Sequence, residues 1–315
     1  MHDARAMALV RRLWVVLGIA VLSVAPALAA RGARRVIAAA QDRVAALASM
    51  AEAERAFAQA AGELGIRGAF IKFLDDDAVG FQPTLGRAKD VWRARPTPPD
   101  PRAMKLEWEP RTGDVAASGD LGWLTGPYVL TPNGDAAQTQ HGCYFSVWRR
   151  AGASAPWLVM LDQGVSLDQA CTFPDAGFHA LADDRDMFTG EGRNATATLL
   201  DADRAIAHTA TTSGPSRALL ASSHELVRLL RNGRQPMVGA DARRWLESIT
   251  GAGTFTTTNG QAALAGDVGY TYGSYAFAAG DRTPAESGYY VRVWRRRVDG
   301  TWRITADVLA PTRKD

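Results

Sequence analysis

Two stretches of this chain, "GCYFSVWRR" at residues 142–150 and "GYYVRVWRR" at residues 288–296, are nearly identical and lie 146 positions apart. The blocks around them match as well. "SGDLGWLTGPY" (118–128) corresponds to "AGDVGYTYGSY" (265–275), and "WLVMLD" (157–162) corresponds to "WRITAD" (302–307). A long internal repeat with nearly constant spacing predicts that a domain-sized unit is duplicated within the chain.

Each copy is expected to place helices before strands. In the first copy, "MAEAERAFAQAAGELG" (50–65) is rich in helix formers, and shorter helices are expected over residues 67–74 and 86–95. Strands are expected near residues 105–111, 121–130, 139–150 and 157–165. The second copy predicts helices over residues 199–211, 215–231 and 240–249, again followed by strands. This order is typical of an α+β fold with an antiparallel sheet, because parallel sheets alternate strand and helix.

Three glycines stand at matching positions in each copy: Gly119, Gly122 and Gly126 in the first, and Gly266, Gly269 and Gly273 in the second. A sharply bent strand needs residues that tolerate unusual backbone angles or the close approach of another backbone. The spacing therefore predicts a curved sheet and a structural role for these glycines.

With these helices, strands and the motifs "GDLGWLTGPY" and "GCYFSVWRR…WLVMLD", the chain resembles the nuclear transport factor 2-like (NTF2-like) superfamily, and more narrowly its SnoaL-like and ketosteroid-isomerase-like branch. The resemblance implies two tandem cone-shaped domains, each of about three N-terminal helices packed on a curved antiparallel sheet around an apolar cavity. Members of the superfamily use that cavity for isomerisation, dehydration, cyclisation, hydrolysis or plain ligand binding. Many of them dimerise through the outer face of the sheet.

The repeat and the resemblance together divide the chain into five parts. These are a signal peptide at residues 1–29, an N-terminal helical segment at 30–49, a first domain at 50–170, a connector at 171–196 and a second, divergent domain at 197–313.

The first 29 residues have the parts of a secretory signal peptide. Arg11 and Arg12 precede an uncharged apolar run over residues 13–24, and "ALA" at 27–29 offers a cleavage site. We therefore expect an exported protein, periplasmic or secreted, with cleavage near Ala29 and no stable membrane span afterwards; an uncleaved anchor helix is the alternative. Without this segment the formal net charge falls from +3 to +1, which gives no electrostatic reason to bind nucleic acid.

The chain has two cysteines, Cys143 and Cys171, which export would bring into an oxidising compartment. They are expected either to form one disulfide or to remain two buried thiols. The sequence contains neither a Cys-x-x-Cys motif, nor a His-rich spacing, nor a glycine-rich phosphate loop. It therefore predicts no metal site and no cofactor.

The run Asp75-Asp76-Asp77 is the sharpest candidate for chemistry, because the branch commonly has an acidic helix end. One of these carboxylates could act as a general base if burial or its charged neighbours raised its pKa. The alternative is a solvated helix terminus. His141 and Tyr128 are the candidates for an acid partner, although a histidine at a strand edge more often lies on the surface.

Aromatic side chains are expected to line the cavity. The candidates for ligand contact are Phe73, Phe81, Trp123, Tyr144 and Trp148, and for Trp148 the alternative is packing in the core or at a dimer face. Alternation along residues 141–148 places His141 on one face of its strand and Tyr144 on the other. Asp162 and Asp307 recur in both copies, and we interpret this recurrence as a sign of a structural role.

Three functions are compatible with these features. The sequence favours a binding or accessory module for a small apolar or carbonyl-bearing ligand, because no complete catalytic set can be found by spacing. The first alternative is a lyase- or isomerase-type enzyme with a carboxylate base in the first cone. The second is a structural pseudo-dimer, in which two copies in one chain imitate a homodimer and bury the outer sheet faces without a ligand. A homodimer of the whole chain is also compatible with the sequence.

Overall fold

The computed structural model of the protein describes residues 42–82, 84–132, 138–174, 177–180, 188, 192–280 and 285–312. Ala45–Asp315 is one compact unit, separate from Met1–Val44. The predicted signal peptide and residues 30–41 of the predicted N-terminal segment lie outside the described residues. Within the described ranges, no helix is both long and apolar enough to cross a membrane.

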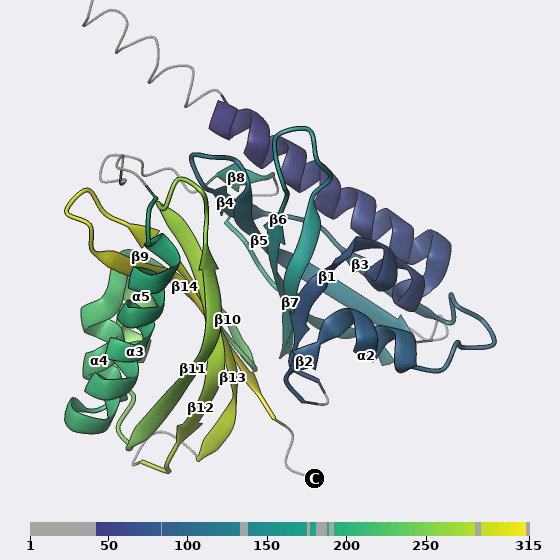
Figure 1. The fold of residues 1–315 in the computed structure, drawn as a ribbon. Coiled ribbons are helices and arrows are strands. Elements are labelled where there is room, and N and C mark those ends of the chain that lie inside the picture. The colour runs from purple at the N-terminus through teal and green to yellow at the C-terminus, as the bar shows by residue number, and fades with distance from the viewer. Residues whose placement is uncertain are drawn as a thin grey trace, which may run out of the picture. The chain divides into compact units, whose positions relative to one another are not determined.

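The compact unit begins with a helical run that covers residues 45–73 (Figure 1). Gly65 lies within this run with a φ of +73°, the left-handed conformation that ends an α-helix. A Cβ atom at Gly65 would lie 2.1 Å from the carbonyl oxygen of Pro101, so only glycine fits there. The run is therefore a long helix followed by a short one, as the sequence predicts.

The first sheet follows this run. Its elements are β1 (Leu74–Gly80), β2 (Gly86–Arg87), helix α2 (Ala88–Ala94), β3 (Met104–Trp108), β4 (Thr112–Val115), β5 (Leu121–Pro132), β6 (Gln140–Arg149), β7 (Leu158–Leu167) and β8 (His179–Ala180). The strand order is β2-β1-β7-β6-β5-β4-β8, and β3 also pairs with β5. The pairs β1–β7 and β4–β8 are parallel, and the others are antiparallel.

The second half of the chain repeats this plan. Its elements are α3 (Ala195–Ser213), α4 (Pro215–Ser222), β9 (Ser223–Arg231), β10 (Arg234–Val238), α5 (Ala240–Glu247), β11 (Gly253–Ala262), β12 (Val268–Phe277), β13 (Glu286–Arg296) and β14 (Trp302–Pro311). The strand order is β10-β9-β14-β13-β12-β11, and β9–β14 is parallel as β1–β7 is. Figure 1 shows α3, α4 and α5 together on one side of this sheet. The fold is thus α+β with two tandem domains, called the first cone (residues 45–174) and the second cone (residues 192–312) below.

One predicted helix is wrong in its second half. Residues 215–231 are helical only as far as Ser222, and the rest form β9, which lies beside β14. The pairing buries Leu229 and Leu230. Local helix propensity in "HELVRLLR" is therefore outweighed by the gain from extending the sheet. The predicted helix end at residues 75–77 is also a strand in the structure. Asp75, Asp76 and Asp77 lie in β1.

One face of each sheet packs against the other sheet. A single buried cluster combines Trp123 and Phe145 of the first cone with Tyr270 and Val291 of the second. Trp123 and Phe145 stack with their ring centroids 5.1 Å apart. Beside this cluster, Arg295 of β13 and Asp114 of β4 form a buried ion pair across the contact, with 2.6 Å between Nε and Oδ2.

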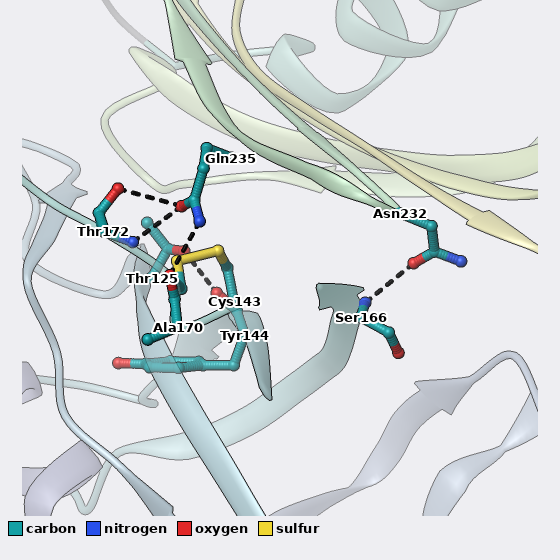
Figure 2. Close-up of a disulfide and its surroundings, with 9 residues drawn as sticks. Thr125, Cys143, Tyr144, Ser166, Ala170, Thr172, Asn232 and Gln235 are labelled. Carbon is teal, nitrogen blue, oxygen red and sulfur yellow. Dashed lines mark hydrogen bonds between the residues drawn. A yellow bond between two sulfur atoms is a disulfide. The ribbon is translucent and has the colours of Figure 1, made fainter. Parts of the chain in front are cut away.

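A disulfide joins Cys143 of β6 to Cys171, just beyond β7 (Figure 2). The segment that it anchors contacts the second cone directly. Gln235 of β10 accepts a hydrogen bond of 2.8 Å from the backbone N–H of Thr172 and donates one of 2.8 Å to the carbonyl of Ala170. The disulfide therefore fixes a stretch of chain that lies between the two cones.

The recurring glycines are structural. Gly126 of β5 and Gly273 of β12 occupy matching positions, and a Cβ atom there would lie 1.9 Å from the carbonyl oxygen of Glu109 and 2.0 Å from that of Thr256. Each sheet therefore requires a residue without a side chain at this point.

Candidate functional site

The helical run of residues 45–73, α2 and the inner face of the first sheet enclose a cavity of about 600 Å³. Its wall is largely apolar and contains six aromatic side chains: Phe70, Phe81, Trp92, Trp108, Tyr128 and Tyr144. The polar side chains on the wall include Gln82, Asp162, Gln163 and Ser166. The first cone is therefore hollow, and Arg67, Arg95 and Asp100 add charged groups to its wall.

Asp162 is the acid that the first sheet contributes to the wall of this cavity. It lies in β7, directly opposite Ser146 of β6. Its side chain is half-buried: solvent reaches it through the cavity, while protein surrounds it on the other sides. This burial raises the pKa of Asp162 from 3.8 to about 8, and the negative charge of Glu54 adds to the rise. Asp162 is thus mostly protonated at neutral pH.

Glu54 lies in the long helix, fully buried beneath the cavity. Its carboxylate accepts three hydrogen bonds: from Trp108 Nε1 at 2.7 Å, from Ser146 Oγ at 2.5 Å and from Trp148 Nε1 at 2.8 Å. Burial raises the pKa of Glu54 to about 7, although these three donors work in the opposite direction. Two acids with raised pKa values therefore stand close together in the first cone.

Tyr144 contributes a buried hydroxyl group to the cavity wall. It lies on the cavity wall, and its hydroxyl oxygen is buried with no hydrogen-bond partner among the described residues. Burial first, and then the charges of Glu54 and Asp162, raise the pKa of Tyr144 well above its usual range, so the proton stays on the oxygen. Tyr128 also lies on the wall, with its hydroxyl 3.5 Å from Ser166 Oγ.

The matching region of the second cone is filled by an arginine. Arg292 is fully buried and donates to Asp203 Oδ1 at 2.7 Å and to Asp307 Oδ2 at 2.9 Å. Arg231 donates to the other oxygen of Asp307 at 2.5 Å. Although burial alone would raise the pKa of Asp307, the two guanidinium groups hold it below its ordinary value. The second cone thus keeps Asp307 ionised, with cations of its own.

No protein-family model and no curated protein matches the chain. The solved structures that it is similar to include proteins described as NTF2-like or ketosteroid isomerase-like. A ketosteroid isomerase-like protein from Erwinia carotovora atroseptica matches with 14% identity and a TM-score of 0.32, over 38% of this chain and 97% of that one. An NTF2-like protein of unknown function from Pseudomonas putida has 13% identity and a TM-score of 0.31, and the match covers 38% of this chain and 89% of that one. An NTF2-like protein of unknown function from Shewanella oneidensis has 17% identity and a TM-score of 0.28, and the match covers 36% of this chain and 95% of that one.

The described wall of the cavity in the first cone does not include the aspartate triplet. Asp75 is bound by Arg149, whose Nη2 and Nε lie 2.8 Å and 3.1 Å from its carboxylate oxygens. Asp76 is exposed and pairs with Lys89 at 2.8 Å. Asp77 is exposed as well and pairs with Arg87 at 3.2 Å. The structure therefore places all three aspartates in ion pairs away from the described cavity wall, with Asp75 buried and the other two exposed.

The other candidates from the sequence divide between the two faces of the first sheet. Phe81, Tyr128 and Tyr144 lie on the cavity wall. Trp123 is on the opposite face, packed between the sheets, and His141 shares that face by strand alternation. His141 is therefore not brought together with Tyr128 at the cavity. Phe73 and Trp148 belong to the core beside the cavity, where Phe73 stacks on Phe57 and Trp148 donates to Glu54.

Glu54 and Asp162 are the functional candidates that sequence reasoning missed. Asp162 recurs as Asp307, and recurrence favoured a structural role, which the structure shows for Asp307 alone. The informative signal was one of the three motif positions that differ between the copies. Ser146 stands in the first nine-residue motif where Arg292 stands in the second. That exchange removes a buried cation from the first cone.

Proposed function

We propose that the protein binds a small, largely apolar molecule in the first cone, and that the second cone is a supporting domain. The observation that carries this proposal is the cavity of about 600 Å³ whose wall holds Asp162 and the unpartnered hydroxyl of Tyr144. A volume of this order is usual for small-molecule sites, which are mostly apolar with a few polar groups that orient the ligand. A buried donor without an acceptor costs free energy, and a ligand acceptor would remove that cost.

Native mass spectrometry of the purified full-length chain tests this proposal. We expect a small molecule that leaves the protein on activation in the gas phase. A Leu106→Trp variant, which places an indole into the cavity from β3, should lose this molecule. The matched control is Leu264→Trp at an exposed position of the second cone, which should keep it. Equal retention of the molecule by the two variants would place it outside the cavity.

A second candidate function is enzymatic proton transfer, in the manner of a lyase or isomerase. It is favoured by the pKa of about 8 at Asp162, because a group that titrates near neutral pH can both accept and return a proton. Asp162 would take a proton from a carbon next to a ligand carbonyl, and Tyr144 would donate a hydrogen bond to the carbonyl oxygen. Deuterium uptake from D2O into a bound ketone, lost in Asp162→Asn, would support this function. Unchanged uptake in that variant would exclude it.

We further propose that the protein is exported and that its two cones form an intramolecular pseudo-dimer. The disulfide between Cys143 and Cys171 supports export, because such bonds persist in oxidising compartments. The buried cluster shared by the two sheets supports the pseudo-dimer. Intact-mass analysis of the expressed protein should give a chain that begins after Ala29 and carries two hydrogens fewer than the reduced form. A chain that retains residues 1–29 would contradict cleavage.

A further inference from the structure

We propose that the ligand of the first cone carries a positively charged nitrogen group, such as an amidinium or guanidinium, and that this group lies between Glu54 and Asp162. The proposal rests on the function proposed above and specifies the chemical class of the ligand. It comes from a comparison of the two cones, which share the same set of acidic and aromatic groups around this point.

In the second cone this set holds a cation. The guanidinium of Arg292 lies between the carboxylates of Asp203 and Asp307, at 2.7 Å and 2.9 Å. Its central carbon also lies 4.3 Å from the ring centroid of Phe255 and 4.0 Å from that of Tyr290. Two carboxylates and two aromatic faces are the groups that attract a planar cation away from water.

The first cone has a counterpart for each group of this set. Asp162 lies opposite Ser146 in the β6–β7 pair, as Asp307 lies opposite Arg292 in the β13–β14 pair. Trp108 lies opposite Tyr128, as Phe255 lies opposite Tyr275. The remaining counterparts follow from the sequence repeat: Tyr144 for Tyr290, and Glu54 for Asp203.

The first cone has no arginine at the position that corresponds to Arg292. Ser146 occupies the place of Arg292, and its hydroxyl donates to Glu54 at 2.5 Å. Counting onward from the β1–β7 and β9–β14 pairs, the position of Arg231 corresponds to Gln82, two residues beyond the end of β1. Within the described residues, neither Glu54 nor Asp162 forms an ion pair.

The arginines on the cavity wall have other partners. Arg67 donates to the backbone carbonyls of Arg93 and Arg95 at 2.9 Å and 3.1 Å. Arg95 stacks over the ring of Trp92, with its central guanidinium carbon 3.9 Å from the centroid. Arg55, next to Glu54 in the helix, pairs with Glu109 and Glu52. Among the described residues, Glu54 and Asp162 thus have no ion-pair partner when they are ionised, and a cationic ligand would supply one.

The cavity provides both the space and the remaining polar contact for such a ligand. An apolar body would lie among Phe70, Trp92 and Leu130, which line the cavity of about 600 Å³. The unpartnered hydroxyl of Tyr144 is a donor, so it would serve a ligand acceptor or turn toward Asp162 once that acid is ionised. A carbonyl ligand would use this donor but would leave both acids without a cation.

The two ligand classes differ in the sign of their pH dependence. A cation requires ionised acids, so its binding releases protons and becomes tighter as the pH rises toward about 8, the pKa of Asp162. A carbonyl group accepts a hydrogen bond from the protonated acid, so its binding becomes weaker over the same interval. The charges that act on Asp162 and Tyr144 include those of Glu54, Glu109 and Arg55, and Arg67, Arg95 and Asp100 also line the cavity. Of these, Glu54, with a pKa of about 7, would lose its proton in the same direction as Asp162.

The test is calorimetric titration of the full-length protein, at pH 6 and pH 8, with two nearly isosteric probes. These are naphthalene-2-carboxamidine, which is a cation, and naphthalene-2-carboxamide, which is a neutral carbonyl compound. We expect the amidine to bind about tenfold tighter than the amide at pH 8, to tighten from pH 6 to pH 8 and to release protons on binding. Asp162→Asn should abolish the preference, while Asp76→Asn, at an exposed position of the same cone, should keep it.

A second variant tests the comparison of the cones directly. Ser146→Arg places in the first cone the side chain that Arg292 places in the second, so it should bind neither probe and should melt at a higher temperature than the parent protein. Equal or tighter binding of the amide would overturn the inference while leaving the cavity a ligand site. If neither probe binds, and 2-methylnaphthalene does not bind either, the proposed function itself fails.

Discussion

Replacing Asp162 by asparagine removes a carboxyl group from the cavity wall and keeps its shape. In the folded protein burial and the charge of Glu54 raise the pKa of Asp162 from 3.8 to about 8. In the unfolded chain the group returns to its ordinary value. The folded state therefore holds a proton that the unfolded state has released between about pH 4 and pH 8, and the parent protein loses stability as the pH rises through this interval.

The size of the effect follows from the shift. Each pKa unit corresponds to about 1.4 kcal/mol, so a rise from 3.8 to about 8 corresponds to about 6 kcal/mol of destabilisation once Asp162 is ionised. Glu54 and Asp162 repel each other, so the pair titrates as a unit and part of this cost is shared. Asp162→Asn should therefore leave stability nearly unchanged at pH 4 and raise the free energy of unfolding by about 3–5 kcal/mol at pH 9.

Equilibrium unfolding in urea at pH 4, 7 and 9, with the disulfide intact, measures this difference. The second cone supplies the matched control at the same strand position. Asp307→Asn takes a carboxylate from between Arg231 and Arg292, and uncompensated buried charges should lower stability by about 3–5 kcal/mol at all three pH values. The two substitutions should thus act in opposite directions at pH 9. Destabilisation by both would refute the difference that we assign to the two cones.

Three further outcomes are expected from the contacts that hold the fold together. Asp114→Ala, which removes the carboxylate that Arg295 binds across the sheets, should cost about 3 kcal/mol in a thermal melt, and a loss below 0.5 kcal/mol would contradict its role. Cys143 and Cys171 are 28 residues apart in sequence, so reduction of their disulfide should lower the free energy of unfolding in urea by about 3.5 kcal/mol. An unchanged free energy of unfolding on adding reductant would mean that the bond adds nothing to stability. Gly126→Ala should lower the melting temperature by several degrees, because its Cβ would lie 1.9 Å from the carbonyl oxygen of Glu109, and an unchanged melt would show that the strand can move aside.

The fold was predictable to a large extent, because its signals are local or repeated. The nine-residue motifs, the glycine positions and the order of helices before strands predict two tandem α+β domains. The prediction failed where local propensity and tertiary pairing disagree. Residues 223–231 are rich in helix formers but extend the second sheet beside β14, and no local pattern distinguishes that outcome.

The site was harder to predict, because its chemistry depends on the absence of an arginine at the buried position of Ser146. Three adjacent aspartates at 75–77 attract attention in a sequence, yet each of them forms an ion pair with a cation that is not part of the described cavity wall. Asp162 looks structural because it recurs as Asp307. Its distinct character comes from Ser146, whose short side chain leaves two acids without the cation that Arg292 supplies in the other cone. The repeat thus contained the signal in the one position of the motif where serine replaces arginine.

The ionisation of Asp162 itself is the most direct measurement of this difference between the cones. Carbon-13 NMR of the aspartate carboxyl groups in the full-length protein, with Asp162 and Asp307 assigned from their asparagine variants, gives both titration curves in one experiment. We predict a midpoint near pH 8 for Asp162, and a midpoint below the ordinary value of 3.8 for Asp307. A midpoint for Asp162 close to that of an ordinary aspartate would show that its charge is already compensated, and would leave the cavity without the unpaired acid on which ligand binding is argued.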